Sequence, residues 1–195
     1  MTDRHADRRG LPRWHPSPLV QSAITTIRAL GWSVMAVSDE CSCASLECEP
    51  PDCSFAYTSG LHLGPIPELA VYGLDARTAQ AVLNEMVDVL RWRNWRTLVE
   101  HEIEFTIDSI DSTLRLIELV DKSDLLITNE LFPDAAVLQV VWADDHGAYP
   151  WEEGYSLEVR DQFIKGVEGV GRDVGPRVIS RSTGPNRAQR RKRKR

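Results

Sequence analysis

The chain has 195 residues, a hydrophobic content of 42% and a formal net charge of −6. This composition excludes an intrinsically disordered chain, and the length fits one domain with appendages. No apolar run approaches the roughly 18 residues of a membrane span, and the charged N-terminus lacks the apolar core of a secretory signal. We therefore expect a cytoplasmic protein that has no membrane partner.

The first half of the chain predicts a helix and three strands. Residues 1–16 are expected to form a flexible N-terminal arm, after which Ser17 and Pro18 are typical of a helix start and Gly31 of its end. "WSVMAVS" (residues 32–38) reads as a strand, and "SFAYTSG" (residues 54–60) reads as the strand that returns. A third strand is expected in "PELAVYGL" (residues 67–74).

The second half continues the alternation of helices and strands. Asp75 is a good N-cap for an amphipathic helix that runs to Arg93. "EHEIEFTID" and "STLRLIELV" alternate as an antiparallel strand pair, and "KSDLLITNELF" predicts a short helix. "AAVLQVVWA" is typical of a central strand, with Leu138, Val140 and Trp142 on one face and Val137, Gln139 and Val141 on the other.

These elements follow no regular βαβ rhythm. We therefore predict an α+β fold: a single domain over residues 17–165, with a mainly antiparallel sheet and two to three helices. Within it, residues 39–54 form a cysteine-rich loop insertion. From residue 166 to residue 195, glycines and charges replace the apolar periodicity, which predicts a linker and a basic disordered tail.

All four cysteines of the chain lie in the insertion, as Cys41, Cys43, Cys48 and Cys53. Four thiolates suit tetrahedral Zn²⁺, which can fix a short loop. The first pair is closer together than in common zinc motifs, and the neighbouring acids oppose thiolate formation. A structural zinc and free thiols are therefore equally favoured, with disulfide or redox chemistry behind them.

The C-terminus is strongly basic within an acidic chain. Its last nine residues hold seven cations, and removing these leaves 16 basic against 29 acidic residues, a net charge near −13. Such a tail is either a solvated end or a sequence-independent nucleic-acid anchor. The residues that would contact phosphate are Arg187, Arg190, Arg191, Lys192, Arg193, Lys194 and Arg195.

Three stretches resemble the bacterial and phage family DUF4262, a domain of unknown function. They are "FAYTSGL" (residues 55–61), "PELAVYGL" and "LQVVWADDHGAYPWEEGY" (residues 138–155), and the resemblance spans roughly residues 30–156. The family usually has a histidine two residues before its Pro-Glu glutamate. Here Ile66 stands at that position, and His62 is a possible substitute. The resemblance implies a fold neighbourhood but no reaction.

The residues of these stretches supply the candidate functional groups. Tyr57, Trp142, Trp151 and Tyr155 could line an aromatic ligand-binding pocket with acids at its mouth, or they could simply pack on the sheet. His62, Glu68 and Asp144 are weak catalytic candidates.

Three hypotheses follow, and whether the chain is an enzyme stays open among them. The first is a non-catalytic module that binds a small molecule or a partner protein. The second is a hydrolase-like enzyme that uses His62, Glu68 and the acids near Trp151. The third is a nucleic-acid-associated factor anchored by the basic tail.

Overall fold

The structure, a computed structural model, describes residues 10–37, 54–167 and 178–180. Its strands are β1 (Ser33–Val37), β2 (Phe55–Ser59), β3 (Glu68–Tyr72), β4 (Glu104–Thr106), β5 (Thr113–Leu119), β6 (Val137–Trp142), β7 (Gly166–Val167) and β8 (Val178–Ser180). Its α-helices are α1 (Pro18–Leu30), α2 (Ala76–Leu90), α3 (Trp95–Glu100) and α4 (Leu126–Leu131), and its 3-10 helices are η1 (Leu61–Leu63) and η2 (Val159–Asp161).

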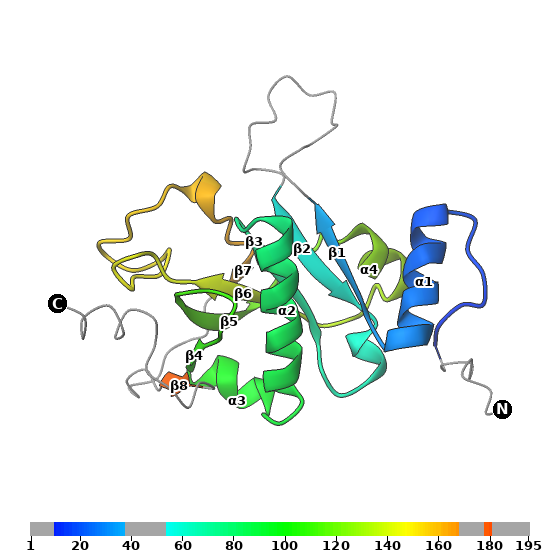
Figure 1. The fold of residues 1–195 in the computed structure, drawn as a ribbon, viewed down its shortest axis with the longest axis horizontal. Coiled ribbons are helices and arrows are strands. Elements are labelled where there is room, and N and C mark those ends of the chain that lie inside the picture. Colours follow the sequence, from blue (N-terminus) through cyan, green and yellow to red (C-terminus); the bar gives the residue numbers. More distant parts are fainter. Residues whose placement is uncertain (1–9, 38–53, 168–177, 181–195) are drawn as a thin grey trace, which may run out of the picture.

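One sheet contains all of these strands. Their order is β1-β2-β3-β6-β5-β4-β8, and β7 pairs with β5 (Figure 1). The β3–β6 and β4–β8 pairs are parallel, and the other five pairs are antiparallel. The predicted α+β class and mainly antiparallel sheet are therefore confirmed.

Strand β6 lies between β3 and β5, so both of its edges are paired. On the face that we call the α2 face, Leu138 and Val140 pack in the main core with α2, and Trp142 packs against its margin. Val137 and Val141 belong to clusters on the opposite face, which we call the α1 face. The predicted central strand and its two faces are thus confirmed.

Two helices cover each face of the sheet. Helix α2 buries a stripe with helical spacing that includes Ala79, Val82 and Met86, and α3 adds Leu98 to the same core. Helices α1 and α4 cover the other face, where Ile24 and Ile127 share a cluster with Tyr57. Figure 1 shows α2 lying across the sheet and α1 beside α4 at its β1 end.

Local signals explain most helix boundaries. Asp75 caps α2 by accepting hydrogen bonds from the Arg77 and Thr78 N–H groups at 3.0 and 3.1 Å. Gly31 ends α1 with a φ of 106°, which only glycine adopts easily. The described residues contain one α-helix more than predicted, because Asn94 accepts a hydrogen bond from the Arg96 N–H group and caps the additional helix α3.

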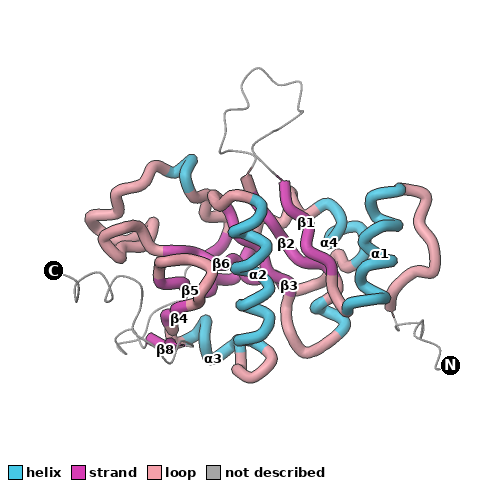
Figure 2. The backbone as a smooth tube through the Cα atoms, in the orientation of Figure 1, coloured by secondary structure: helices cyan, strands magenta, loops and turns pink. Residues whose placement is uncertain are grey.

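The chain beyond the predicted domain end at residue 165 still joins the sheet, through β7 and β8. Gly166 lies so close to β5 that a Cβ atom there would stand 2.4 Å from the Glu118 carbonyl oxygen. Figure 2 shows that the connection from β6 to this segment is mostly loop and lies at the end of the molecule away from α1.

Candidate functional site

Asp144 organises the loop that follows β6. One carboxylate oxygen accepts hydrogen bonds from the backbone N–H groups of His146 and Ala148, both at 2.9 Å. The other accepts the backbone N–H and the hydroxyl of Ser156, both at 2.7 Å. The Ser156 hydroxyl bond, aided by the backbone donors, holds the pKa of Asp144 well below its usual range. Asp144 therefore closes the loop from residue 144 to residue 156.

This loop places two aromatic rings on the α1 face of the sheet. The Tyr149 side chain is buried, and its hydroxyl donates to Thr113 Oγ1 on β5 at 3.0 Å. The Trp151 ring stacks on the Tyr149 ring, with centroids 5.5 Å apart and an interplanar angle of 9°. The Tyr149 ring also covers Arg115, whose Cζ atom lies 4.2 Å from the ring centroid. The result is a layer of aromatic rings over a buried cation.

Arg115 connects three segments of the chain and is only 7% exposed. Its Nη2 atom lies 2.8 Å from the Glu104 carboxylate on β4, and its Nη1 atom lies 3.1 Å from the Glu152 carboxylate in the loop. Burial alone would lower the pKa of Arg115, but the hydrogen bond and charge of Glu104 raise it. Arg115 therefore stays charged and fastens the loop to the sheet.

Buried polar atoms without a hydrogen-bond partner also gather in this part of the molecule. In the described residues there are four: Thr106 Oγ1, Ser109 Oγ, Arg115 Nε and Trp151 Nε1. All four belong to the β4–β5 hairpin or to the covering loop. Since buried polar groups are almost always paired, such a concentration needs an explanation. The two nitrogens are donors only, so an acceptor would satisfy them.

We call this region the Arg115 corner. It comprises Glu104, Thr106, Arg115, Tyr149, Trp151 and Glu152. Trp151 was predicted from the sequence as a site residue, whereas Arg115 and Glu104 were not. A signal was present, since Arg115 lies in line with Ile117 and Leu119, at an inward position of an otherwise apolar alternation.

The weak catalytic candidate Glu68 has a structural environment of its own. It is completely buried, and it accepts hydrogen bonds from the Thr58 hydroxyl at 2.7 Å and from the N–H groups of Gly60 and His62 at 2.7 and 3.0 Å. Burial raises the pKa of Glu68, and these hydrogen bonds oppose the shift. The carboxyl group therefore fastens the turn after β2 to the start of β3.

The three catalytic candidates are not brought together. His62 reaches Glu68 through its backbone, while its exposed ring lies 6.0 Å from the ring of Phe132. Glu68 pairs with Val137 at the start of β6, whereas Asp144 follows the end of that strand. At about 3.3 Å per residue, Glu68 and Asp144 are roughly 20 Å apart along the sheet.

The four aromatic candidates lie in different places. Tyr57 is buried on the α1 face between the sheet and α4, and its hydroxyl accepts a backbone N–H from that helix at 3.3 Å. Trp142 packs on the α2 face, and Trp151 lies in the Arg115 corner. The Tyr155 hydroxyl accepts a hydrogen bond from Gln162 at 3.1 Å. Tyr57 and Trp142 thus line opposite faces of the sheet.

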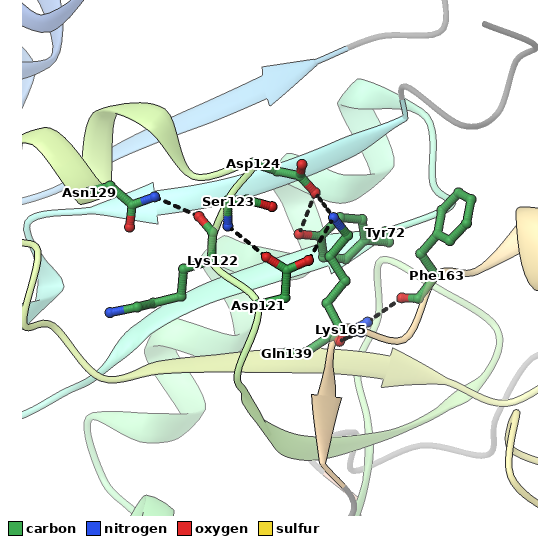
Figure 3. A network of polar contacts seen from close by, with 9 residues as sticks. All are labelled: Tyr72, Asp121, Lys122, Ser123, Asp124, Asn129, Gln139, Phe163 and Lys165. Atoms are coloured by element: carbon green, nitrogen blue, oxygen red, sulfur yellow. Dashed lines mark hydrogen bonds and ion pairs between the residues drawn. The ribbon is translucent and has the colours of Figure 1, made fainter. Parts of the chain in front are cut away.

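A second polar network lies on the α1 face (Figure 3). The Lys165 ammonium group forms ion pairs with Asp121 and Asp124, and the Tyr72 hydroxyl donates to Asp124 at 3.3 Å. Burial and the Asp124 charge raise the pKa of Tyr72. Gln139 donates to the Phe163 carbonyl and accepts the Lys165 N–H at 2.8 Å. This network fastens the segment before β7 to the sheet, and its groups satisfy one another.

Two predicted sites lie outside the described residues. These are the zinc site at Cys41, Cys43, Cys48 and Cys53, and the phosphate-binding tail at residues 187–195. In the part of the chain that is described, no group of three or more metal-ligating side chains occurs. No helix in that part is both long and apolar enough to cross a membrane.

Fold and site together define the class of the protein: a small α+β domain whose mainly antiparallel sheet carries helices on both faces and an arginine-centred corner under a long loop. The family described as "Domain of unknown function (DUF4262)" matches residues 26–156, and the chain belongs to this family. The resemblance seen in its motifs is thereby confirmed. No curated protein and no solved structure matches the chain.

Proposed function

We propose that this DUF4262 domain is a non-catalytic module that binds a ligand or partner at the Arg115 corner. The observation that carries the proposal is the gathering there of buried polar atoms without partners, among them the donors Arg115 Nε and Trp151 Nε1. A ligand that brings hydrogen-bond acceptors would satisfy these donors. Trp and Arg are also the residue types that most often dominate binding energy at interfaces.

The state of the acidic residues supports binding rather than catalysis. A general acid or base must reach a proton of the substrate, at about 2.6–3.2 Å. Glu68 and Asp144 instead accept hydrogen bonds from their own chain on both carboxylate oxygens. The hydrolase-like alternative would require these bonds to be exchanged for a substrate.

We further propose that the protein works in the cytoplasm and that its cysteine insertion holds a structural zinc. The pairing of Val37 with Phe55 supports the second point, because it brings the two ends of the insertion together on neighbouring strands. A metal bound by four thiolates would then stabilise the intervening loop. The basic tail remains a candidate for nucleic-acid contact.

The binding proposal can be tested by NMR on the ¹⁵N-labelled full-length chain. Trp151→Phe assigns one of six indole N–H signals, and Trp92→Phe and Trp14→Phe assign two exposed tryptophans as internal references. The probes are a cationic peptide, an acidic peptide, a neutral peptide and a short oligonucleotide. We expect at least one probe to shift the Trp151 indole and Arg115 Nε signals while the reference indoles stay in place.

A binding module with its site elsewhere would give a different result. Probes would then shift other resonances and leave the Trp151 and Arg115 signals unchanged, even at saturation. That outcome, or the absence of any shift with all four probes, would overturn the proposal.

A further inference from the structure

The Arg115 corner has a rim of exposed carboxylates. Asp108 and Asp111 lie in the β4–β5 turn, and Asp145 and Glu153 lie in the loop that covers the corner, with Glu152 partly exposed beside them. Apart from Glu104 and Asp144, whose carboxylates hold other groups of the chain, the segments 104–113 and 143–158 contain six acids and no lysine or arginine. The rim therefore has a strong local negative charge.

The two acidic segments form one surface because they are bonded together. The Ala143 N–H group donates to the Thr113 carbonyl at 3.0 Å, and the Ser112 hydroxyl donates to the Ala143 carbonyl at 2.7 Å. An acidic rim alone attracts any cation. Beneath the rim, the buried Arg115 side chain pairs with the rim residue Glu152 and keeps an Nε–H donor that still requires an acceptor.

A basic polypeptide meets both requirements. Its backbone carbonyls accept hydrogen bonds, and its lysine and arginine side chains complement the carboxylates. A simple metal cation would bring charge but no acceptor, and an anionic ligand would be repelled by the rim. The chemistry of the corner thus favours a cationic segment of protein.

The chain itself contains such a segment. Strand β8 runs parallel to β4, with Ser180 beside Thr106, so its direction is toward the acidic β4–β5 turn. Ser180 is followed by six residues and then by Arg187–Arg195, in which seven of nine residues are cationic.

The reach of this connection is sufficient. Ser180 lies beside Thr106, Thr106 lies beside Thr113, and Thr113 is bonded to Ala143 at the start of the covering loop. These three strand spacings of roughly 4.8 Å each add up to about 14 Å. Six extended residues span up to about 20 Å. The effective concentration of a segment held by so short a linker is on the order of millimolar.

We infer that the segment Arg187–Arg195 binds the acidic rim of the Arg115 corner of its own chain. This inference rests on the proposed function, because it names the class of partner for the same site. The tail is then an internal ligand. An external basic segment must displace it from the rim, and a polyanion that binds the tail would leave the rim free.

A competition experiment on full-length variants tests the inference. A fluorescein-labelled peptide of sequence RAQRRKRKR is titrated at about 50 mM salt, where charge interactions are least screened, and fluorescence anisotropy reports its binding. In the first variant, the seven cations of residues 187–195 are replaced by Gln, so the tail no longer competes. Two further variants add to this neutral tail three substitutions each.

The first set neutralises the rim with Asp111→Asn, Asp145→Asn and Glu153→Gln. The second is a matched control that removes the same charge from exposed acids outside the corner, with Glu100→Gln, Glu118→Gln and Asp134→Asn. If a docked tail leaves about a tenth of the sites free, the neutral-tail variant binds the peptide about tenfold more tightly than the wild type. The rim set abolishes this binding, and the control set changes it about twofold or less.

The alternatives separate cleanly. In one outcome, the wild-type and neutral-tail chains bind the peptide equally well while the rim variant does not bind it. This result would keep the corner as a site for basic segments but would reject the chain's own tail as its occupant. Equal losses in the rim and control variants, or no peptide binding to any variant, would overturn the inference. The proposed function would still be decided by the Trp151 and Arg115 signals in the wider probe set.

Discussion

Replacing Glu68 by alanine should destabilise the domain by several kcal/mol. The buried carboxyl group accepts three hydrogen bonds, from Thr58, Gly60 and His62, and alanine would leave all three donors without it. A buried unsatisfied donor costs about 1–3 kcal/mol. Because the His62 N–H group is only partly buried, we expect a total of about 3–5 kcal/mol. For a chain of this size, 1 kcal/mol corresponds to roughly 2–4 °C in Tm, so Tm should fall by about 6–20 °C.

The assay is thermal and urea unfolding of Glu68→Ala, Glu68→Gln and Glu100→Ala, the last as an exposed control. Glutamine keeps the volume and one oxygen acceptor, so its loss should be about 1–2 kcal/mol. The control should stay within about 0.5 kcal/mol of the wild type. Unfolding of Glu68→Ala within about 1 kcal/mol of the wild type would refute the structural role assigned to this carboxyl group.

The pH dependence of Glu68→Gln gives an independent check. Burial raises the pKa of Glu68 in the folded state above its ordinary value of 4.5, so the unfolded chain ionises first as pH rises. The stability that Glu68 contributes is therefore complete below about pH 4.5 and declines as pH rises through the folded-state pKa. Glutamine does not titrate. The stability advantage of the wild type over Glu68→Gln should consequently shrink on going from acid toward neutral pH, and an advantage that grows would contradict the raised pKa.

Three further outcomes are expected. Val140→Asp should abolish soluble expression, because an unpaired carboxylate would be buried in the core; normal yield and normal melting of this variant would count against that placement. The purified chain should carry about one Zn²⁺, and Cys43→Ser or Cys48→Ser should lose it while the core stays folded; metal-free protein with four titratable thiols would favour free cysteines. Deleting residues 187–195 should remove sequence-independent DNA binding, which in the full chain should weaken by about three decades between 50 and 200 mM salt; DNA binding that survives the deletion would place the site elsewhere.

Much of the fold was predictable from local patterns. Val137–Trp142 reads as a central strand because apolar side chains occupy both of its faces, and the structure pairs both of its edges. Helix α2 was predicted from the spacing of its buried residues together with the capping residue Asp75. In these places, propensity, periodicity and capping all favour the same structure.

The candidate site was harder to predict, because its contacts join distant segments. Arg115 meets Glu104 across a hairpin and Glu152 from a loop 37 positions further along. Nothing in the local sequence shows that Tyr149 covers this arginine or that Tyr57 and Trp142 lie on opposite faces. Tertiary contacts decide which side chains are buried and which partners they have. The only trace of these contacts in the sequence is an arginine at an inward position of a strand.

Glu68 and Asp144 show why an acid near a strand end is ambiguous in sequence. A catalytic carboxylate and a carboxylate that holds a turn occupy the same kind of position, beside glycine-rich turns with free N–H groups. The distinction lies in how many donors point at the oxygens. Both acids here have donors on both oxygens, which leaves little capacity for a substrate. Arg115 presents the opposite case, since it retains a buried donor after forming two ion pairs. In this domain, the buried group that indicates a recognition site is therefore Arg115, which keeps an unpaired donor, and not Glu68 or Asp144.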